Sequence, residues 1–268
     1  MLKDILIPSI LLGGLGLVFG ILLAYTSKKL SVKHDARIES IRAQLPGVNC
    51  GACGKSGCDG FAEALVKGEA KVGDCKVCGA EASLMICQIL GVEISPQTQK
   101  VARVMCSGSN AISKKKFEYA GIEDCAAAAA LFGGDQACSY GCLGLGSCVK
   151  ACKFGAIVIK NGLAGVIESE CTGCMQCISA CPKNIIRMVP ASSGVTVYCS
   201  SLDKGAVVRQ NCEVGCIGCK KCSKVCPENA ISFEGTLAVI DPVKCNNCGQ
   251  CINECPTGAI SSSLSFDF

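Results

Sequence analysis

Cysteine is the residue type with the clearest chemistry in this chain, because it makes up 26 of the 268 residues and recurs at short, regular spacings. Three runs follow the pattern C-x2-C-x2-C-x3-C-P: Cys171, Cys174, Cys177 and Cys181; Cys216, Cys219, Cys222 and Cys226; and Cys245, Cys248, Cys251 and Cys255. Three closely spaced thiolates can hold three irons of one 4Fe-4S cubane, while the cysteine before the proline reaches a neighbouring cluster. The runs therefore predict paired clusters and electron transfer.

Disulfides and structural zinc are the two alternatives to clusters for so many cysteines. A disulfide framework suits short secreted domains, and cysteines separated by two residues are poorly placed to bridge each other. Zinc sites usually use C-x2-C pairs separated by a dozen or more residues, unlike these runs. The single histidine, His34, excludes a Rieske centre, which needs two. Iron–sulfur clusters are therefore the predicted cofactor.

An internal repeat is visible when residues 138–152 (CSYGCLGLGSCVKAC) are set against residues 212–226 (CEVGCIGCKKCSKVC). The two strings have equal length, and their cysteines coincide except that Leu145 of the first replaces Cys219 of the second. Each copy is predicted to be a ferredoxin-like unit with two clusters. A Val-x-Cys-Ser segment precedes each string, at residues 104–107 and 197–200.

One ligand is missing from the first copy because of Leu145, and Cys138 is the nearest replacement upstream. The predicted ligand sets of the two units are Cys138, Cys142, Cys148 and Cys181; Cys152, Cys171, Cys174 and Cys177; Cys216, Cys219, Cys222 and Cys255; and Cys226, Cys245, Cys248 and Cys251. The alternative partners of Cys138 are Cys106, Cys125 and the pair Cys199 and Cys212.

A different cysteine motif, C-x2-C-x4-C-x16-C, precedes the repeats and consists of Cys50, Cys53, Cys58 and Cys75. Glycines in its loop allow the backbone to wrap closely around a cluster. The motif predicts one complete 4Fe-4S set, so five clusters are expected in the chain. Cys78 and Cys87 are predicted to be packed thiols, since Cys87 lies in an apolar helical pattern. A sixth cluster would use Cys106, Cys125, Cys199 and Cys212.

Residues 5–25 (ILIPSILLGGLGLVFGILLAY) carry no charge. At about 1.5 Å per residue, a helix of this length spans the roughly 30 Å hydrocarbon core of a membrane. A secretory signal peptide has a shorter apolar region and a small-x-small cleavage site, which does not follow here. Lys28, Lys29, Lys33 and Arg37 come next, so the positive-inside rule predicts a single-pass anchor with the bulk of the chain in the cytoplasm.

The motifs predict an α+β protein with a single transmembrane helix, a small 4Fe-4S domain and two tandem ferredoxin-like units. The expected boundaries are 1–27, 28–95, 96–190 and 191–268. A net charge of +4 and 4% aromatic residues give little support to nucleic-acid binding. Basic runs at residues 114–116 and 220–224 are usually solvated faces, and they could also dock an acidic redox partner.

The order of these parts is similar to that of the B subunit of the Rnf complex, the membrane-bound ion-translocating ferredoxin:NAD oxidoreductase of bacteria. The resemblance covers essentially the whole chain, although family members commonly have one double-cluster unit and this chain has two. It implies an iron–sulfur relay subunit of the bacterial inner or plasma membrane. Such a subunit accepts electrons from soluble ferredoxin and passes them to other Rnf subunits, where NAD is reduced and sodium or protons are transported.

Catalytic and nucleotide-binding patterns are absent from the sequence, which contains no P-loop and no G-x-G-x-x-G between a strand and a helix. We therefore expect no catalytic site on this chain, with the translocase activity belonging to the complex. One alternative is an independent membrane-anchored polyferredoxin that feeds a hydrogenase or reductase. A zinc-stabilised interaction scaffold is another.

Overall fold

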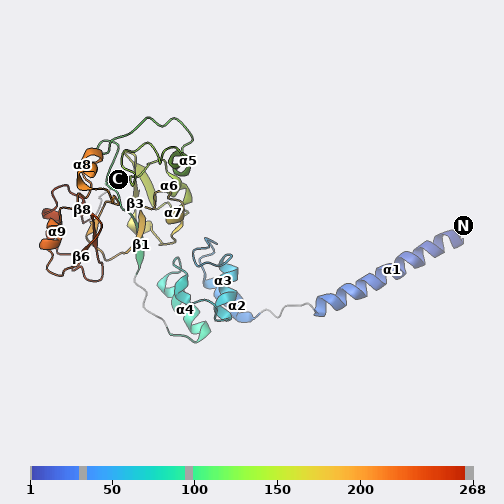
Figure 1. The fold of residues 1–268 in the computed structure, drawn as a ribbon. Coiled ribbons are helices and arrows are strands. Elements are labelled where there is room, and N and C mark those ends of the chain that lie inside the picture. Colours follow the sequence, from blue (N-terminus) through green and yellow to red (C-terminus); the bar gives the residue numbers. More distant parts are fainter. Residues whose placement is uncertain (1, 30–34, 94–98, 263–268) are drawn as a thin grey trace.

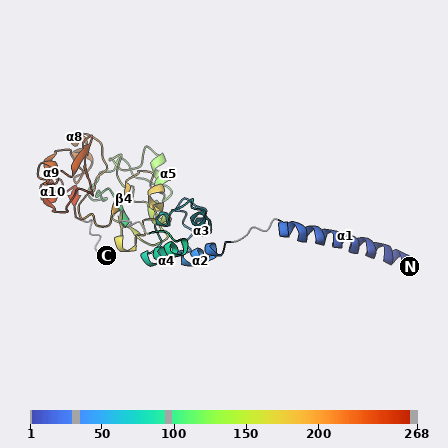
Figure 2. The ribbon, with the colours of Figure 1, turned by 90° about the horizontal axis from the view of Figure 1, so that it is seen from below.

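The computed structural model describes residues 2–29, 35–93 and 99–262. Helix α1 (Leu2–Lys29) extends away from the rest of the protein in both views (Figures 1 and 2). Among the described residues, none of the helices meets the combined length and apolarity expected of a membrane span. Lys33, His34 and the expected boundary at residues 95 and 96 lie outside the described residues.

A small helical domain follows α1 along the chain. It contains α2 (Ala36–Gln44), α3 (Cys58–Val66), the 3-10 turn η1 (Val72–Asp74) and α4 (Ala80–Leu90). Ile41, Phe61 and Ile86, one from each α-helix, are almost completely buried and form the centre of its core. Because the three helices pack on one another, the loop between α2 and α3 is held on a rigid support.

The first α+β unit begins with β1. In chain order its elements are β1 (Lys100–Val104), α5 (Cys125–Ala130), α6 (Ser147–Ala151), β2 (Ile157–Lys160), β3 (Leu163–Val166), η2 (Glu168–Glu170), α7 (Gln176–Ser179) and β4 (Ile186–Pro190). β2 and β3 form an antiparallel hairpin, and the first strand pairs antiparallel with the last, with Val104 opposite Ile186. Because β1 pairs with β4, the two ends of the unit lie side by side, and the helices and the β2–β3 hairpin lie between them in the chain.

The second α+β unit repeats this arrangement. Its elements are β5 (Thr196–Val197), α8 (Gly205–Asn211), α9 (Lys221–Lys224), β6 (Ile231–Glu234), β7 (Leu237–Ile240), α10 (Gln250–Asn253) and β8 (Ile260–Ser261). Again the middle strands form an antiparallel hairpin, and the first strand pairs with the last. The α+β content predicted from the sequence is confirmed, and the sequence repeat is also a repeat of strand pairing.

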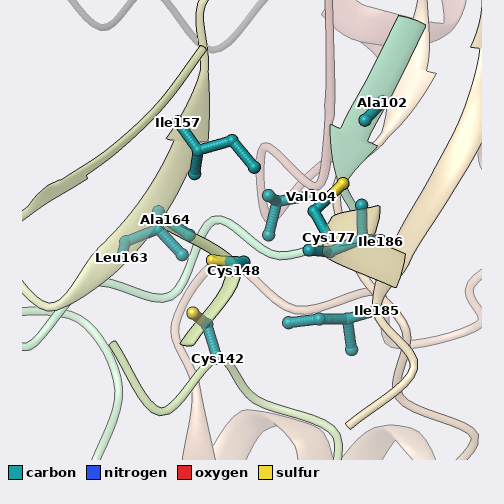
Figure 3. Close-up of a cluster of buried hydrophobic side chains, with 10 residues drawn as sticks. All are labelled: Ala102, Val104, Cys142, Cys148, Ile157, Leu163, Ala164, Cys177, Ile185 and Ile186. Atoms are coloured by element: carbon teal, nitrogen blue, oxygen red, sulfur yellow. The ribbon is translucent and has the colours of Figure 1, made fainter. Parts of the chain in front are cut away.

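Cysteines form part of the hydrophobic core of each unit. Figure 3 shows Cys142 and Cys148 beside Ala164, and Cys177 beside Ile186, within one buried cluster. In the second unit, Cys222 and Cys251 are buried in the corresponding way. All of these except Cys142, which lies in the loop before α6, are carried by short helices that pack against the strands.

Arg103 ties the first unit to the chain that enters the second. Its side chain is 6% exposed and forms an ion pair with Glu168, with Nε to Oε1 at 2.6 Å and a second hydrogen bond to Oε2 at 3.0 Å. Arg103 also donates to the Ser193 carbonyl and the Thr196 hydroxyl, at 2.6 and 2.8 Å. Because a buried guanidinium is costly unless it is paired and hydrogen-bonded, these contacts hold β5 against β1 in one arrangement.

Candidate metal centres

The small helical domain contains one cavity lined by the four cysteines of its motif, Cys50, Cys53, Cys58 and Cys75. Asn49 shapes the loop around it, because its Oδ1 atom accepts a 2.8 Å hydrogen bond from the Cys58 amide. Gly57 has a left-handed φ of +126° and lies so close to Asn49 that a Cβ atom would be 2.9 Å from Oδ1. The structure therefore brings together the whole set proposed from the sequence of this domain.

The four cysteine loops of the two units share one backbone conformation. Two residues after the first cysteine the chain is left-handed, at Gly144, Gly173, Gly218 and Asn247, with φ of 69°, 72°, 66° and 59°. It is left-handed again two residues later, at Gly146, Met175, Lys220 and Gly249. A positive φ is uncommon for residues such as methionine and lysine, so its recurrence indicates a loop that the surrounding structure determines. The loop of the first copy keeps this shape although Leu145 replaces a cysteine.

The second unit contains two cavities, and each is lined by one of its expected ligand sets. One set is Cys216, Cys219, Cys222 and Cys255, and the other is Cys226, Cys245, Cys248 and Cys251. Each cysteine run therefore supplies three members to one cavity and its last cysteine to the other. Cys219 and Cys248 are exposed, whereas the remaining members are buried or half-buried. The second unit thus presents its cavities close to the protein surface.

In the first unit, the thiols of Cys152, Cys171, Cys174 and Cys177 lie within electrostatic reach of one another. Burial and the negative charge of the three neighbouring thiolates raise the pKa of Cys177 to about 11. The Ala102 amide donates a 3.4 Å hydrogen bond to the Cys171 sulfur, which fixes that side chain against β1. These four cysteines are the set expected from the sequence to bind one cluster, and that assignment stays a prediction.

The second cysteine set of the first unit lines a cavity, and it differs from the expectation. The cysteines that line it are Cys125, Cys142, Cys148 and Cys181. Cys138, which was expected in this set from the sequence, instead lines a separate cavity with Cys106, Cys199 and Cys212. In this set, Cys125 therefore takes the place that was expected for Cys138.

Helix α5 brings Cys125 to this cavity. Asp124 caps the helix, and its second carboxylate oxygen accepts a 2.7 Å hydrogen bond from the Ser147 hydroxyl. The Ser147 oxygen in turn accepts a 2.7 Å hydrogen bond from the Cys125 amide. Since Ser147 begins α6 and Cys148 follows it, these bonds dock α5 beside the cavity. Leu145 packs against the small core formed around α5, so its apolar side chain supports the helix that supplies the missing thiol.

Several of these thiols would be difficult to ionise without a nearby positive charge. Burial first, and neighbouring thiolates second, raise the pKa of Cys148 to about 12 and that of Cys222 to about 11. Among the described residues, no group of three or more Cys, His, Asp or Glu side chains is arranged to hold a single metal ion. In a 4Fe-4S cluster each thiolate binds a different iron, and the irons supply the charge that displaces the thiol protons. The cysteine sets around the cavities fit such a group.

Three family models match the cysteine-rich parts of the chain. The Fe-S cluster model matches residues 45–77, the 4Fe-4S binding domain matches residues 164–187, and the 4Fe-4S dicluster domain matches residues 215–259. Each matched range contains cysteines of the cavities described above. The chain therefore carries 4Fe-4S clusters in small iron–sulfur domains.

Curated relatives match most of the chain. It is 45% identical over 246 residues to the B subunit of the Na+-translocating ferredoxin:NAD+ oxidoreductase complex of Acetobacterium woodii, a match that covers 91% of this chain and 74% of that protein. It is 42% identical to the B subunit of the ion-translocating oxidoreductase complex of Methanosarcina acetivorans, over 91% and 93% of the two chains. The chain belongs to the family of Rnf complex B subunits.

A third Rnf B relative comes from the proton-translocating ferredoxin:NAD+ oxidoreductase complex of Clostridium ljungdahlii, and it is 41% identical over 86% of this chain and 82% of that protein. Membership of the Rnf B family makes this chain an iron–sulfur electron-transfer subunit of a membrane-associated complex. It decides against the zinc-stabilised scaffold and against an independent polyferredoxin. The names of the relatives give different ions, sodium for the Acetobacterium woodii complex and protons for the Clostridium ljungdahlii complex.

Cys78 and Cys87, which belong to none of the cysteine sets described above, give a direct test of the first-domain set. Cys87 is buried, and the Cys78 thiol is hydrogen-bonded to that of Cys75. In a Cys78→Ala background, where Cys78 cannot replace its neighbour, Cys75→Ala should remove one cluster, or about four irons. Cys87→Ala in the same background should remove none, because it loses only packing. Iron and sulfide analysis of anaerobically prepared protein measures both, and equal losses would contradict the assignment.

Proposed function

We propose that this Rnf B protein accepts electrons from reduced ferredoxin and relays them toward NAD reduction coupled to sodium or proton translocation. The observation that supports the proposal is the succession of cysteine-lined cavities through the chain after α1. The proposed ligand sets are Cys50, Cys53, Cys58 and Cys75; Cys125, Cys142, Cys148 and Cys181; Cys152, Cys171, Cys174 and Cys177; Cys216, Cys219, Cys222 and Cys255; and Cys226, Cys245, Cys248 and Cys251.

A hydrogen bond joins the loops of two of these sets across the boundary between the helical domain and the first unit. The Gln176 amide nitrogen donates to the Cys50 carbonyl at 2.9 Å. Gln176 begins α7 and directly precedes Cys177, so the bond brings the first-domain loop beside the loop of the next set. Electrons transfer readily only between clusters that lie close together, and this contact supports a continuous path from one part of the chain to the next.

The second unit is the proposed docking site for ferredoxin. Its exposed Cys219 is followed by Lys220, Lys221 and Lys224, which are also exposed and offer positive charge to an acidic partner. The other basic run is less available, since Lys115 pairs with Asp135 at 2.9 Å and Lys116 donates to a backbone carbonyl. Electrons would then pass from the second unit toward the helical domain.

Helix α1 is the proposed membrane anchor, with the rest of the chain on the cytoplasmic side. Its large apolar side chains between Leu15 and Leu23 are 54–68% exposed. Apolar surface of this extent needs a cover, and lipid or helices of other Rnf subunits provide one. Lys28 and Arg37 follow the apolar segment on the side where the positive-inside rule places the cytoplasm.

The relay can be tested with membranes and with the isolated protein. Membranes that lack this subunit should lose ferredoxin-dependent NAD reduction and the coupled ion movement. The purified full-length protein should be reduced by low-potential ferredoxin and should not reduce NAD alone. Rapid NAD reduction by the isolated protein, or unimpaired activity of membranes without it, would contradict the relay.

Charge reversal then locates the docking site in the same assay. Lys221→Glu combined with Lys224→Glu should slow reduction by ferredoxin about tenfold at low salt, and the difference should shrink as salt screens the charges. Lys114→Glu is the matched control for Lys221→Glu alone, because Lys114 is exposed and belongs to the other basic run. If Lys114→Glu slowed reduction by ferredoxin more than the second-unit variants did, the docking site would lie on the first unit.

A further inference from the structure

Four cysteines outside the proposed sets surround a cavity at the junction of the two units. They are Cys106, Cys138, Cys199 and Cys212. The space that they line measures about 470 Å3 including its open mouth, compared with 310–340 Å3 for the four other cysteine-lined cavities. The junction cavity is therefore at least as large as the cavities that are lined by the proposed cluster ligands.

The four cysteines are two pairs of equivalent residues, one of each pair from each unit. Cys106 follows β1, and Cys199 follows the corresponding strand β5. Cys138 and Cys212 are the first residues of the two aligned cysteine strings. A group bound between them would therefore receive two ligands from each copy of the repeat.

Reciprocal hydrogen bonds join the two units beside this cavity. The Ser107 hydroxyl donates to the Tyr198 carbonyl at 3.2 Å, and the Ser200 hydroxyl donates to the Met105 carbonyl at 2.9 Å. Each serine follows a lining cysteine, and each carbonyl belongs to the residue before one. The junction thus has an approximate two-fold symmetry that holds Cys106 and Cys199 in matching positions.

Backbone amides donate hydrogen bonds to the sulfur atoms of all four cysteines. In every case one donor lies two residues further along the chain, and these donors are Gly108, Tyr140, Ser201 and Val214. Hydrogen bonds of this kind stabilise negatively charged thiolates and help to set the potential of a cluster bound to them. An ordinary packed thiol has no need for such a repeated arrangement.

Two further donors connect this cavity to its neighbours. The Cys142 amide donates to the Cys106 sulfur, and the equivalent Cys216 amide donates to the Cys199 sulfur. Cys142 belongs to the nearest set of the first unit, and Cys216 belongs to the nearest set of the second. On each side, a single peptide group therefore lies between the junction cysteines and a proposed cluster ligand.

We propose that Cys106, Cys138, Cys199 and Cys212 hold an additional 4Fe-4S cluster that bridges the two units. The site itself rests on the geometry of the junction. Its role, which is to carry electrons between the Cys216 set and the Cys142 set, rests on the proposed relay function. All but two of the 26 cysteines, Cys78 and Cys87, are then cluster ligands.

Metal analysis of the full-length protein, assembled anaerobically, tests the site without any assay of ferredoxin or NAD. The wild-type protein should contain about 24 irons with equal sulfide. Cys138→Ala and Cys212→Ala should each lose about four irons, and the double variant should also lose about four, because both residues serve one cluster. Ser107→Ala is the matched control at the same junction and should keep the full count. If the alanine variants fail to fold, Cys106→Ser and Cys199→Ser carry the same expectation.

The bridging cluster would be overturned by a wild-type count of about 20 irons, by a loss of about eight in the double variant, or by stoichiometric zinc at the junction. Rapid reduction by ferredoxin then tests its role separately. In the Cys212→Ala variant, ferredoxin should still reduce clusters of the second unit, while reduction of the others slows at least tenfold. Unslowed reduction with four irons missing would leave the site standing and remove its role in the relay.

Discussion

Replacing Cys125 with alanine should cost the protein one iron–sulfur cluster, although Cys125 belongs to none of the C-x2-C runs. The loss should be about four irons and four sulfides per chain. The reason is geometric, because Cys125 lines the cavity that also contains Cys142, Cys148 and Cys181. The Asp124 and Ser147 hydrogen bonds that dock α5 hold the thiol there.

A second substitution provides the matched rescue. Leu145→Cys restores the standard cysteine of this loop, whose backbone already has the same left-handed residues as the other three. The Cys125→Ala/Leu145→Cys variant should therefore regain about four irons. Cys125→Ala/Cys138→Ala should lose about eight, since the two cysteines serve different sites. A full iron count in Cys125→Ala, or a double variant that loses only four, would show that Cys138 is the ligand after all.

Local spacing is the part of the candidate sites that could be predicted from the sequence. The runs that begin at Cys216 and Cys245 occupy tight loops whose left-handed residues turn the first three cysteines of each run toward one cavity. The crossing of the fourth cysteine was also predictable, since x3 spacing moves it out of the loop. The same is true of the first-domain motif, where Asn49 and Gly57 shape the loop only a few residues from its cysteines.

The presence of Cys125 in place of Cys138 depends on contacts between distant parts of the chain. The segment before Cys138 contains α5 and is longer than its counterpart before Cys212, where α8 ends directly at the cysteine. Sequence alignment cannot position an inserted helix, because its docking depends on a side-chain hydrogen bond from Ser147, more than 20 residues away. One signal was available nonetheless. Cys138 and Cys212 occupy equivalent positions in the repeat, which indicated that they share one role.

The largest loss of stability from a single methyl group is expected at Gly144, which lies between Cys142 and Leu145. Its φ of +69° is costly for alanine, and an added Cβ would overlap the carbonyl oxygen of Gly162 in the β2–β3 turn. Backbone strain and overlap each cost about 1–3 kcal/mol. Because the overlap is with backbone, the loop and the hairpin must separate. Gly144→Ala should therefore be destabilised by about 3 kcal/mol and should lose the cluster held by Cys142.

Gly155→Ala separates the two causes. Gly155 has nearly the same φ of +66° in the same unit, but an added Cβ there would meet nothing within 4 Å. Its cost should be strain alone, about 1 kcal/mol, with the full iron count retained. Because a protein with bound clusters unfolds irreversibly, the comparison is best made as the rate of iron release at a fixed temperature under anaerobic conditions. Gly144→Ala should release iron at least tenfold faster than Gly155→Ala. Equal rates of iron release would mean that Gly144 is needed only for its left-handed backbone, and not for the close packing of the cysteine loop on the hairpin.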